Sequence, residues 1–125
     1  MTMRKIIKLK LIIGVIILFT SCSTMSPTQV NNTLPNLTHS IYLTKSEADE
    51  LVKLNKCKYL VKRRSFVAPM GLTAKGDLRN GARGIDEWVA IDGGNAYTLI
   101  SFKWVRVNTD GSTELHLEFD TLLCE

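Results

Sequence analysis

Three cysteine thiols are the most reactive groups in this chain, and their surroundings divide them into one plus two. Cys22 directly follows small residues near the start of the chain, whereas Cys57 and Cys124 lie far apart in the remainder. A cysteine sulfur is a nucleophile that can carry a lipid, and an even pair of cysteines in an oxidising compartment favours a disulfide. We therefore expect Cys57 and Cys124 to pair, with two free buried thiols as the alternative.

The first 21 residues have the parts of a secretory signal peptide: basic residues, an apolar run and small residues before Cys22. The apolar run of about nine residues is shorter than the roughly 20 that a bilayer-spanning helix needs. Its end, Leu18-Phe19-Thr20-Ser21-Cys22, resembles the bacterial lipobox. That resemblance implies a diacylglycerol on the Cys22 thiol, cleavage before it and acylation of the new amino group, so that acyl chains hold the chain in a membrane. An ordinary secretory signal, or an uncleaved anchor with Cys22 unmodified, is the alternative.

Residues 22–40 separate this leader from the rest of the chain and are rich in Ser, Thr, Asn and Pro. They show no helical or strand period, and their composition favours loops and extended chain. We expect a lipidated, flexible tether that lifts a domain from the membrane. In the sorting rule of enterobacterial lipoproteins, Asp directly after the lipidated cysteine is the retention signal. This chain has Ser23 at that position, which resembles an outer-membrane sorting signal and implies a location in the cell envelope facing the periplasm.

The charge distribution gives no indication of a nucleic-acid partner. The formal net charge is +4, but four of the 16 basic residues precede the apolar run and all 12 acidic residues follow it. From Cys22 onward, 12 basic and 12 acidic residues balance. The basic isoelectric point of about 9.1 is thus a property of the leader.

Residues 41–125 are expected to form one small domain, opened by a short strand around 40–43. Thr44 and Glu47 have the spacing of a capping box, which predicts a helix that begins after Thr44 and ends near Asn55.

The strand expected over 57–67 carries much of the domain's positive charge, with a bulge where two arginines interrupt its alternation. Such a cluster could bind anionic lipid, lipopolysaccharide phosphate or an acidic envelope protein. Pairing with acidic residues of the last hairpin, or simple solvation, is the interpretation that we favour. The residues of this candidate anionic-partner patch are Lys58, Lys62, Arg63 and Arg64.

A second helix is expected over 75–91, because one apolar stripe recurs at helical spacing. Gly81 and Gly84 would weaken this helix unless they allow close packing against a sheet. Gly93-Gly94 should end it. The residues of the apolar stripe are Leu78, Ala82, Ile85 and Val89.

The end of the chain reads as a hairpin of strands over 95–107 and 113–124, with a turn over 108–112 whose strongest signal is Asp110-Gly111. The element order predicts an α+β fold: a small, mainly antiparallel sheet covered by one or two helices. The disulfide would then join the start of one strand to the end of the last. The expected inward faces of the hairpin are Ala96, Ile100, Phe102 and Trp104, and Leu115, Leu117, Phe119 and Leu123.

Four short motifs resemble small proteobacterial envelope lipoproteins of unknown function and, more distantly, the RcsF family of stress-sensing outer-membrane lipoproteins. The motifs are Cys57-Lys-Tyr-Leu60, Leu78-Arg-Asn-Gly-Ala-Arg83, Gly93-Gly-Asn-Ala-Tyr97 and Cys124. The resemblance implies a domain closed by a disulfide. The chain departs from the stress sensors in having one cysteine pair in place of two, and no long, proline-rich basic segment.

No sequence motif indicates catalysis or a cofactor. His116, Glu118 and Asp120 alternate along one predicted strand and could face a divalent metal, but a single strand offers few convergent ligands. We expect a solvated strand face and no metal, and we expect Trp88 and Trp104 to pack in the core. The sequence thus predicts a non-enzymatic envelope lipoprotein that binds or supports another envelope component. A stress sensor resembling the RcsF family is the alternative.

Overall fold

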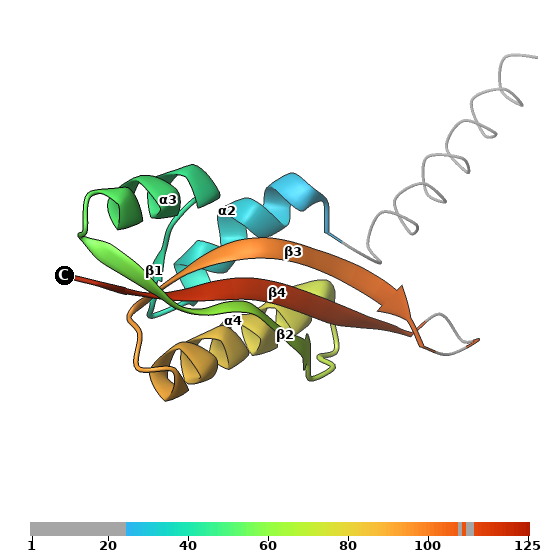
Figure 1. Ribbon diagram of the computed structural model, residues 1–125. Helices are drawn as coiled ribbons and strands as arrows, with labels where there is room; N and C mark the ends of the chain where they lie inside the picture. Colours follow the sequence, from blue (N-terminus) through green and yellow to red (C-terminus); the bar gives the residue numbers. More distant parts are fainter. Residues whose placement is uncertain (1–24, 108, 110–111) are drawn as a thin grey trace, which may run out of the picture.

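Three helices and four strands make up the described part of the computed structural model, which covers residues 25–107, 109 and 112–125 (Figure 1). The predicted turn at Asp110-Gly111, the signal peptide and Cys22 lie outside the described residues. In chain order, the elements are α2 (Pro27–Leu37), β1 (Ile41–Tyr42), α3 (Lys45–Lys53), β2 (Cys57–Ala68), α4 (Ala74–Ile91), β3 (Ala96–Arg106) and β4 (Thr113–Cys124).

The four strands form one sheet in the order β1-β3-β4-β2. The short strand β1 pairs with β3 in parallel, while β4 is antiparallel to both β3 and β2. The predicted α+β fold with a mainly antiparallel sheet is confirmed. Because of these pairings, the end of β2, the end of β3 and the start of β4 lie together. We call this the hairpin end, and the opposite end, which holds Cys57 and Cys124, the disulfide end.

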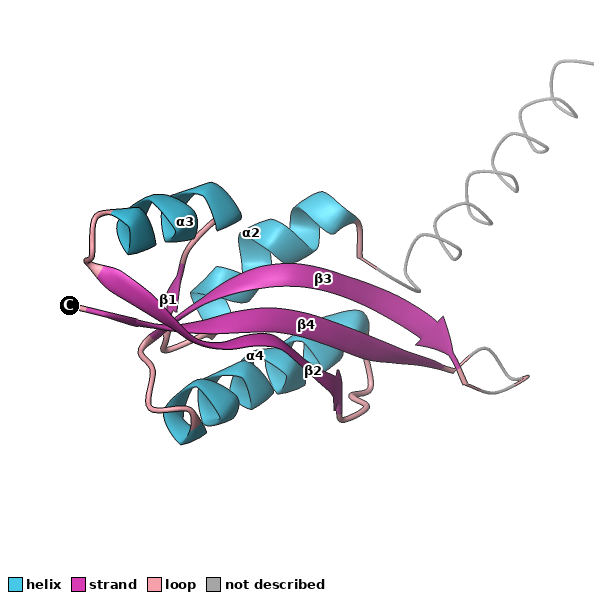
Figure 2. Cartoon of the chain, in the orientation of Figure 1, coloured by secondary structure: helices cyan, strands magenta, loops and turns pink. Residues whose placement is uncertain are grey.

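The helices cover the two faces of the sheet unequally (Figure 2). Helices α2 and α4 pack on one face around the main core, whereas α3 packs on the other face near the disulfide end. The main core is formed by Val30, Leu34, Ala68, Leu78, Ala82, Ile85, Val89, Tyr97, Leu115, Leu117 and Phe119. The cluster beneath α3 is formed by Leu43, Ala48, Cys57, Ala96 and Leu122.

Helix α4 has the predicted apolar stripe and ends where predicted. All four stripe residues are buried in the main core, and Gly93 ends the helix with a φ of 81°. A Cβ at Gly81 would lie 2.7 Å from Leu117 Cδ1, and one at Gly84 would overlap the ring of Phe66. The two glycines therefore let the helix approach the sheet closely, as expected.

Helix α3 also begins as predicted. The Thr44 side chain accepts a hydrogen bond from the Glu47 backbone N–H, and the Glu47 carboxylate accepts one from the Thr44 backbone N–H. The strand that follows has its bulge at the expected place, where Arg63 adopts a φ of 58° and the register with β4 shifts between Val61 and Arg64.

The flexible tether predicted over 22–40 was wrong for the segment that forms α2. Ser26 caps this helix in a capping box with Gln29, and Pro27 occupies its first turn. Val30 and Leu34 are fully buried against α4 and the sheet. Their burial supplies the tertiary contact that a polar, eleven-residue helix needs to persist, so the folded domain begins before residue 41.

The predicted inward face of β3 was wrong over its first half. Tyr97 and Leu99 contact the main core together with Phe102 and Trp104, whereas Ala96 faces α3. A register shift between Leu99 and Ser101 inserts an extra residue and reverses the alternation, because side chains in a strand have a period of two.

The predicted face of β4 fails only at its last position. Leu115, Leu117 and Phe119 are buried as expected, but Leu123 is partly exposed and Leu122 is fully buried instead. The reason is α3, which covers the opposite face of the sheet at the disulfide end and gives Leu122 a core of its own.

Candidate functional site

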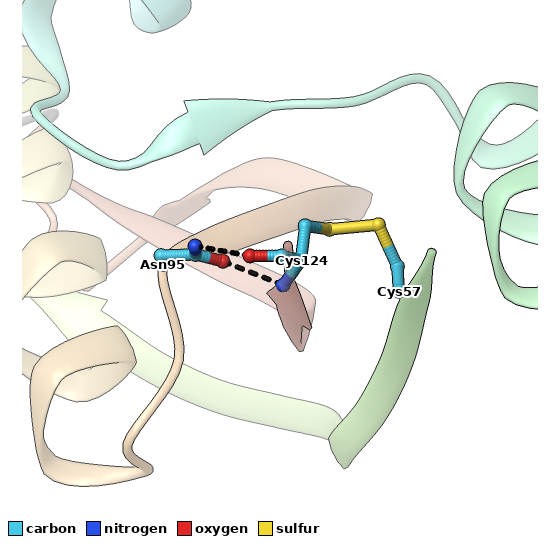
Figure 3. Close-up of a disulfide and its surroundings, with 3 residues drawn as sticks. All are labelled: Cys57, Asn95 and Cys124. Carbon is cyan, nitrogen blue, oxygen red and sulfur yellow. Dashed lines mark hydrogen bonds between the residues drawn. A yellow bond between two sulfur atoms is a disulfide. The ribbon is translucent and has the colours of Figure 1, made fainter. Parts of the chain in front are cut away.

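The disulfide end is closed by a covalent bridge between two directly opposite residues of the sheet (Figure 3). Cys57, the first residue of β2, is joined to Cys124, the last residue of β4, as predicted. Asn95 holds the Cys124 backbone from the other side, because its side-chain amide donates to the Cys124 carbonyl at 2.7 Å and its oxygen accepts from the Cys124 N–H at 2.8 Å. The last residues of β4 are therefore fixed on both sides.

Beside the disulfide, a polar cluster fastens α3 to the sheet. Tyr59 donates a hydrogen bond to Asp49 at 2.5 Å, and Lys45 donates to the Tyr59 hydroxyl at 3.0 Å and lies 3.5 Å from Asp120. The hydrogen bond from Tyr59, with Lys45 beside it, lowers the pKa of Asp49 below its ordinary value. Burial, then the bond to Asp49, raises the pKa of Tyr59. This cluster keeps Tyr59 neutral and Lys45 charged at neutral pH.

The four residues of the candidate anionic-partner patch do not share one surface. Arg64 forms an ion pair with Asp92 at the end of α4, and its guanidinium lies 4.2 Å from the centre of the Trp88 ring. Arg63 lies on the other side of the strand, where its Nε is 3.5 Å from Glu118. The bulge separates the two arginines, because it places consecutive side chains in different environments.

The remaining two residues of the patch are exposed, and one of them packs on an aromatic ring. Lys62 Nζ lies 4.6 Å from the centre of the Tyr59 ring, and Lys58 is exposed next to the disulfide. Arg63 thus pairs with Glu118 of the last hairpin, as the favoured interpretation expects, whereas Arg64 pairs with Asp92 at the end of α4. The two lysines are exposed.

The face of the sheet opposite the main core carries two grooves that α3 leaves uncovered. One groove, of about 440 Å³, is lined by Lys45, Lys62, Arg63, Leu99, Ile100 and Asp120. The other, of about 420 Å³, lies nearer the hairpin end and is lined by Ser65, Phe66, Val67, Ser101, Phe102, Lys103, His116, Leu117 and Glu118. Both grooves mix cationic, anionic and apolar groups, which is the composition of a surface that binds a polar partner.

The three alternating residues of β4 point toward this same face, but they differ in exposure. His116 lies 3.4 Å from Glu114, and Glu118 is partly exposed beside Arg63. Asp120 is buried and accepts a hydrogen bond from the Arg63 backbone at 2.8 Å, so the expectation of a solvated face was wrong for Asp120. Within the part of the chain that the structure describes, no group of three or more His, Cys, Asp or Glu side chains is arranged to hold a metal.

Sequence reasoning missed the residues that join α2 to the rest of the domain. Asp86 on α4 accepts hydrogen bonds from the backbone N–H groups of His39 and Ser40, at 2.8 and 3.0 Å. Thr38 contacts the hydroxyl of Tyr97 at 3.1 Å, and burial raises the pKa of Tyr97 to about 12. The signal available in the sequence was the Ser26 and Gln29 capping box, which has the same spacing as that of Thr44.

Comparisons with family models, curated proteins and solved structures find no match to this chain. The resemblance to envelope lipoproteins and to the RcsF family therefore stays a prediction. Among the helices that the structure describes, none is long and apolar enough to cross a membrane.

Proposed function

We propose that this chain is an exported lipoprotein, held in the cell envelope by acyl chains on Cys22, whose domain binds another envelope component without catalysing a reaction. The observation that carries the proposal is the disulfide between Cys57 and Cys124. Disulfides form and persist in oxidising compartments outside the cytoplasm. With these two sulfurs joined, Cys22 is the one cysteine left, and it follows the lipobox-like sequence.

The uncovered face of the sheet is where we propose that the partner binds. Lys103, His116 and Glu118 surround the groove nearer the hairpin end. The second groove adds Lys62 and Arg63, so the face presents both positively and negatively charged side chains to an envelope protein partner. A structural or binding role fits a surface of this kind, because side chains of both charges line its two grooves.

Intact-mass spectrometry of the membrane fraction tests the anchor. We expect a chain that lacks residues 1–21, carries diacylglycerol and an acyl group on Cys22, and has two thiols available for alkylation only after reduction. A Cys22→Ser variant should stay unprocessed. An unacylated wild-type chain that retains Met1, or one with three free thiols, would rule the proposal out.

Crosslinking in intact cells followed by purification tests the binding role. We expect a defined partner that is lost in the Lys103→Glu variant and kept in Lys53→Glu, an equivalent change on the exposed side of α3. A partner that is recovered only under envelope stress would favour the sensor alternative. The same set of proteins with both variants would show that the uncovered face is not the binding surface.

A further inference from the structure

The loop between β2 and α4 exposes apolar side chains at the hairpin end of the domain. Residues 67–72, Val-Ala-Pro-Met-Gly-Leu, run from the end of β2 into this loop and contain no polar side chain. Leu72 is fully exposed and Met70 is 58% exposed. Loops of this length are usually polar, and a run of exposed apolar residues in a folded domain marks a contact with a partner or a membrane.

This loop is held in place although its apolar side chains face solvent. The Gly71 N–H donates to Asp77 at 2.5 Å, and the Asn80 side chain donates to the Pro69 carbonyl at 2.8 Å. A Cβ at Gly71 would lie 2.8 Å from the Gly76 carbonyl carbon, so the loop packs directly on the first turn of α4. The fold therefore fixes the backbone and presents Met70 and Leu72 without an ordering cost on binding.

The position of α2 places this loop next to the proposed anchor. Figure 1 shows the starts of α2 and α4 at the same end of the molecule as the tips of β3 and β4. Met25 packs against the main core, so the domain begins three residues after Cys22. Three residues span at most about 10 Å even when fully extended. An acylated Cys22 would thus hold the hairpin end at the lipid surface.

The charges around the loop suit an anionic membrane. Lys75 follows the loop in the first turn of α4, and Arg106 ends β3 at the same end of the sheet; both are exposed. Among the described acids near the loop, Asp77 is buried beneath it and Glu114 lies 3.4 Å from His116. Basic side chains beside exposed apolar ones bind the surface of anionic lipid bilayers.

We propose that the loop carrying Met70 and Leu72 docks on the anionic lipid surface of the membrane in which Cys22 is anchored, so that the domain lies against the membrane with its disulfide end directed away. This inference rests on the proposed function, because it takes the acylated Cys22 as the origin of the short link.

Photo-crosslinking of the full chain in its own membranes tests the docking. Benzoylphenylalanine replaces Leu72 in one variant and Leu54 in the other; Leu54 is 56% exposed at the end of α3, near the disulfide. After irradiation, intact-mass analysis separates phospholipid adducts from protein adducts. We expect about tenfold more phospholipid adduct at position 72 than at position 54, since only the former lies in the interface.

A second pair of variants carries the photoprobe in place of Met70 and adds a negative charge elsewhere. Leu72→Asp should lower the lipid adduct, because a carboxylate is repelled from anionic headgroups, whereas Leu54→Asp should leave it unchanged. Acylated protein with equal lipid adducts at 72 and 54, or with protein adducts at 72, overturns the docking and leaves the anchor intact. A chain with no acyl group on Cys22 overturns the anchor and the docking together.

Discussion

At the scale of single residues, two adjacent arginines show how far side chains of one type can differ in this domain. The Arg63 side chain is 79% exposed and that of Arg64 is 26% exposed. Arg64 bonds to the buried Asp92, which also accepts a hydrogen bond from Thr121. The sequence predicts a bulge here but does not tell which arginine turns inward, because that depends on where α4 ends.

Substitution of each arginine by alanine should separate these environments. Arg64→Ala leaves a buried carboxylate without its charged partner and removes the contact with Trp88, so we expect the free energy of unfolding to fall by about 2–3 kcal/mol. Arg63→Ala removes an exposed ion pair and should cost less than about 0.5 kcal/mol. Urea unfolding of the oxidised protein measures both. Equal losses would contradict the assignment of Arg64 to the interior.

At the scale of elements, the segments with a clear period were predictable and the segments that depend on distant contacts were not. The α4 stripe, the Thr44 capping box and the hairpin strands follow from spacing alone. The face of β3 was mispredicted because a bulge changes the alternation without leaving a mark such as Gly or Pro.

Helix α2 was not predicted because its composition is unfavourable for a helix. Pro35 interrupts the segment, and Asn and Thr residues have low helix propensity. The expectation that this segment has no helical period was wrong, because its apolar positions, Val30, Leu34 and Leu37, have helical spacing. Packing on α4 then stabilises the helix. The uncovered face of the sheet could not be predicted either, because the area of the sheet that α3 covers depends on tertiary packing.

Truncation of one core side chain of α2 tests whether this helix belongs to the domain. Leu34→Ala should lower the free energy of unfolding by about 2–5 kcal/mol, as expected for a fully buried leucine. Leu54→Ala, at an exposed position, should cost less than about 0.5 kcal/mol. Denaturant midpoints of the two variants provide the comparison. A Leu34→Ala variant as stable as the parent would restore the flexible tether.

At the scale of the whole molecule, the disulfide joins the start of β2 to the end of β4, at the end of the sheet farthest from the hairpin turn. The cysteines are 67 residues apart in sequence, and closing a loop of this length in the unfolded chain is worth about 4 kcal/mol. A domain of this size has a modest core, so this contribution is large beside its expected stability.

Replacement of both bridged cysteines tests this contribution without leaving either member of the pair as a free thiol. The Cys57→Ser, Cys124→Ser double variant should lose about 4 kcal/mol of unfolding free energy. Reductant should lower the urea midpoint of the parent to that of the variant and leave the variant unchanged. A parent whose midpoint does not respond to reductant would show that the bridge contributes little to stability.

The bulge in β2 has a consequence for molecules crowded on one surface. β2 is the outermost strand on its side of the sheet, and the backbone turns at Arg63 with a φ that a straight strand does not adopt. A strand from a neighbouring copy would find the ladder of N–H and C=O groups broken midway, flanked by the lysine at position 62. A strand of a neighbouring copy is thereby hindered from pairing with the β2 edge of the sheet.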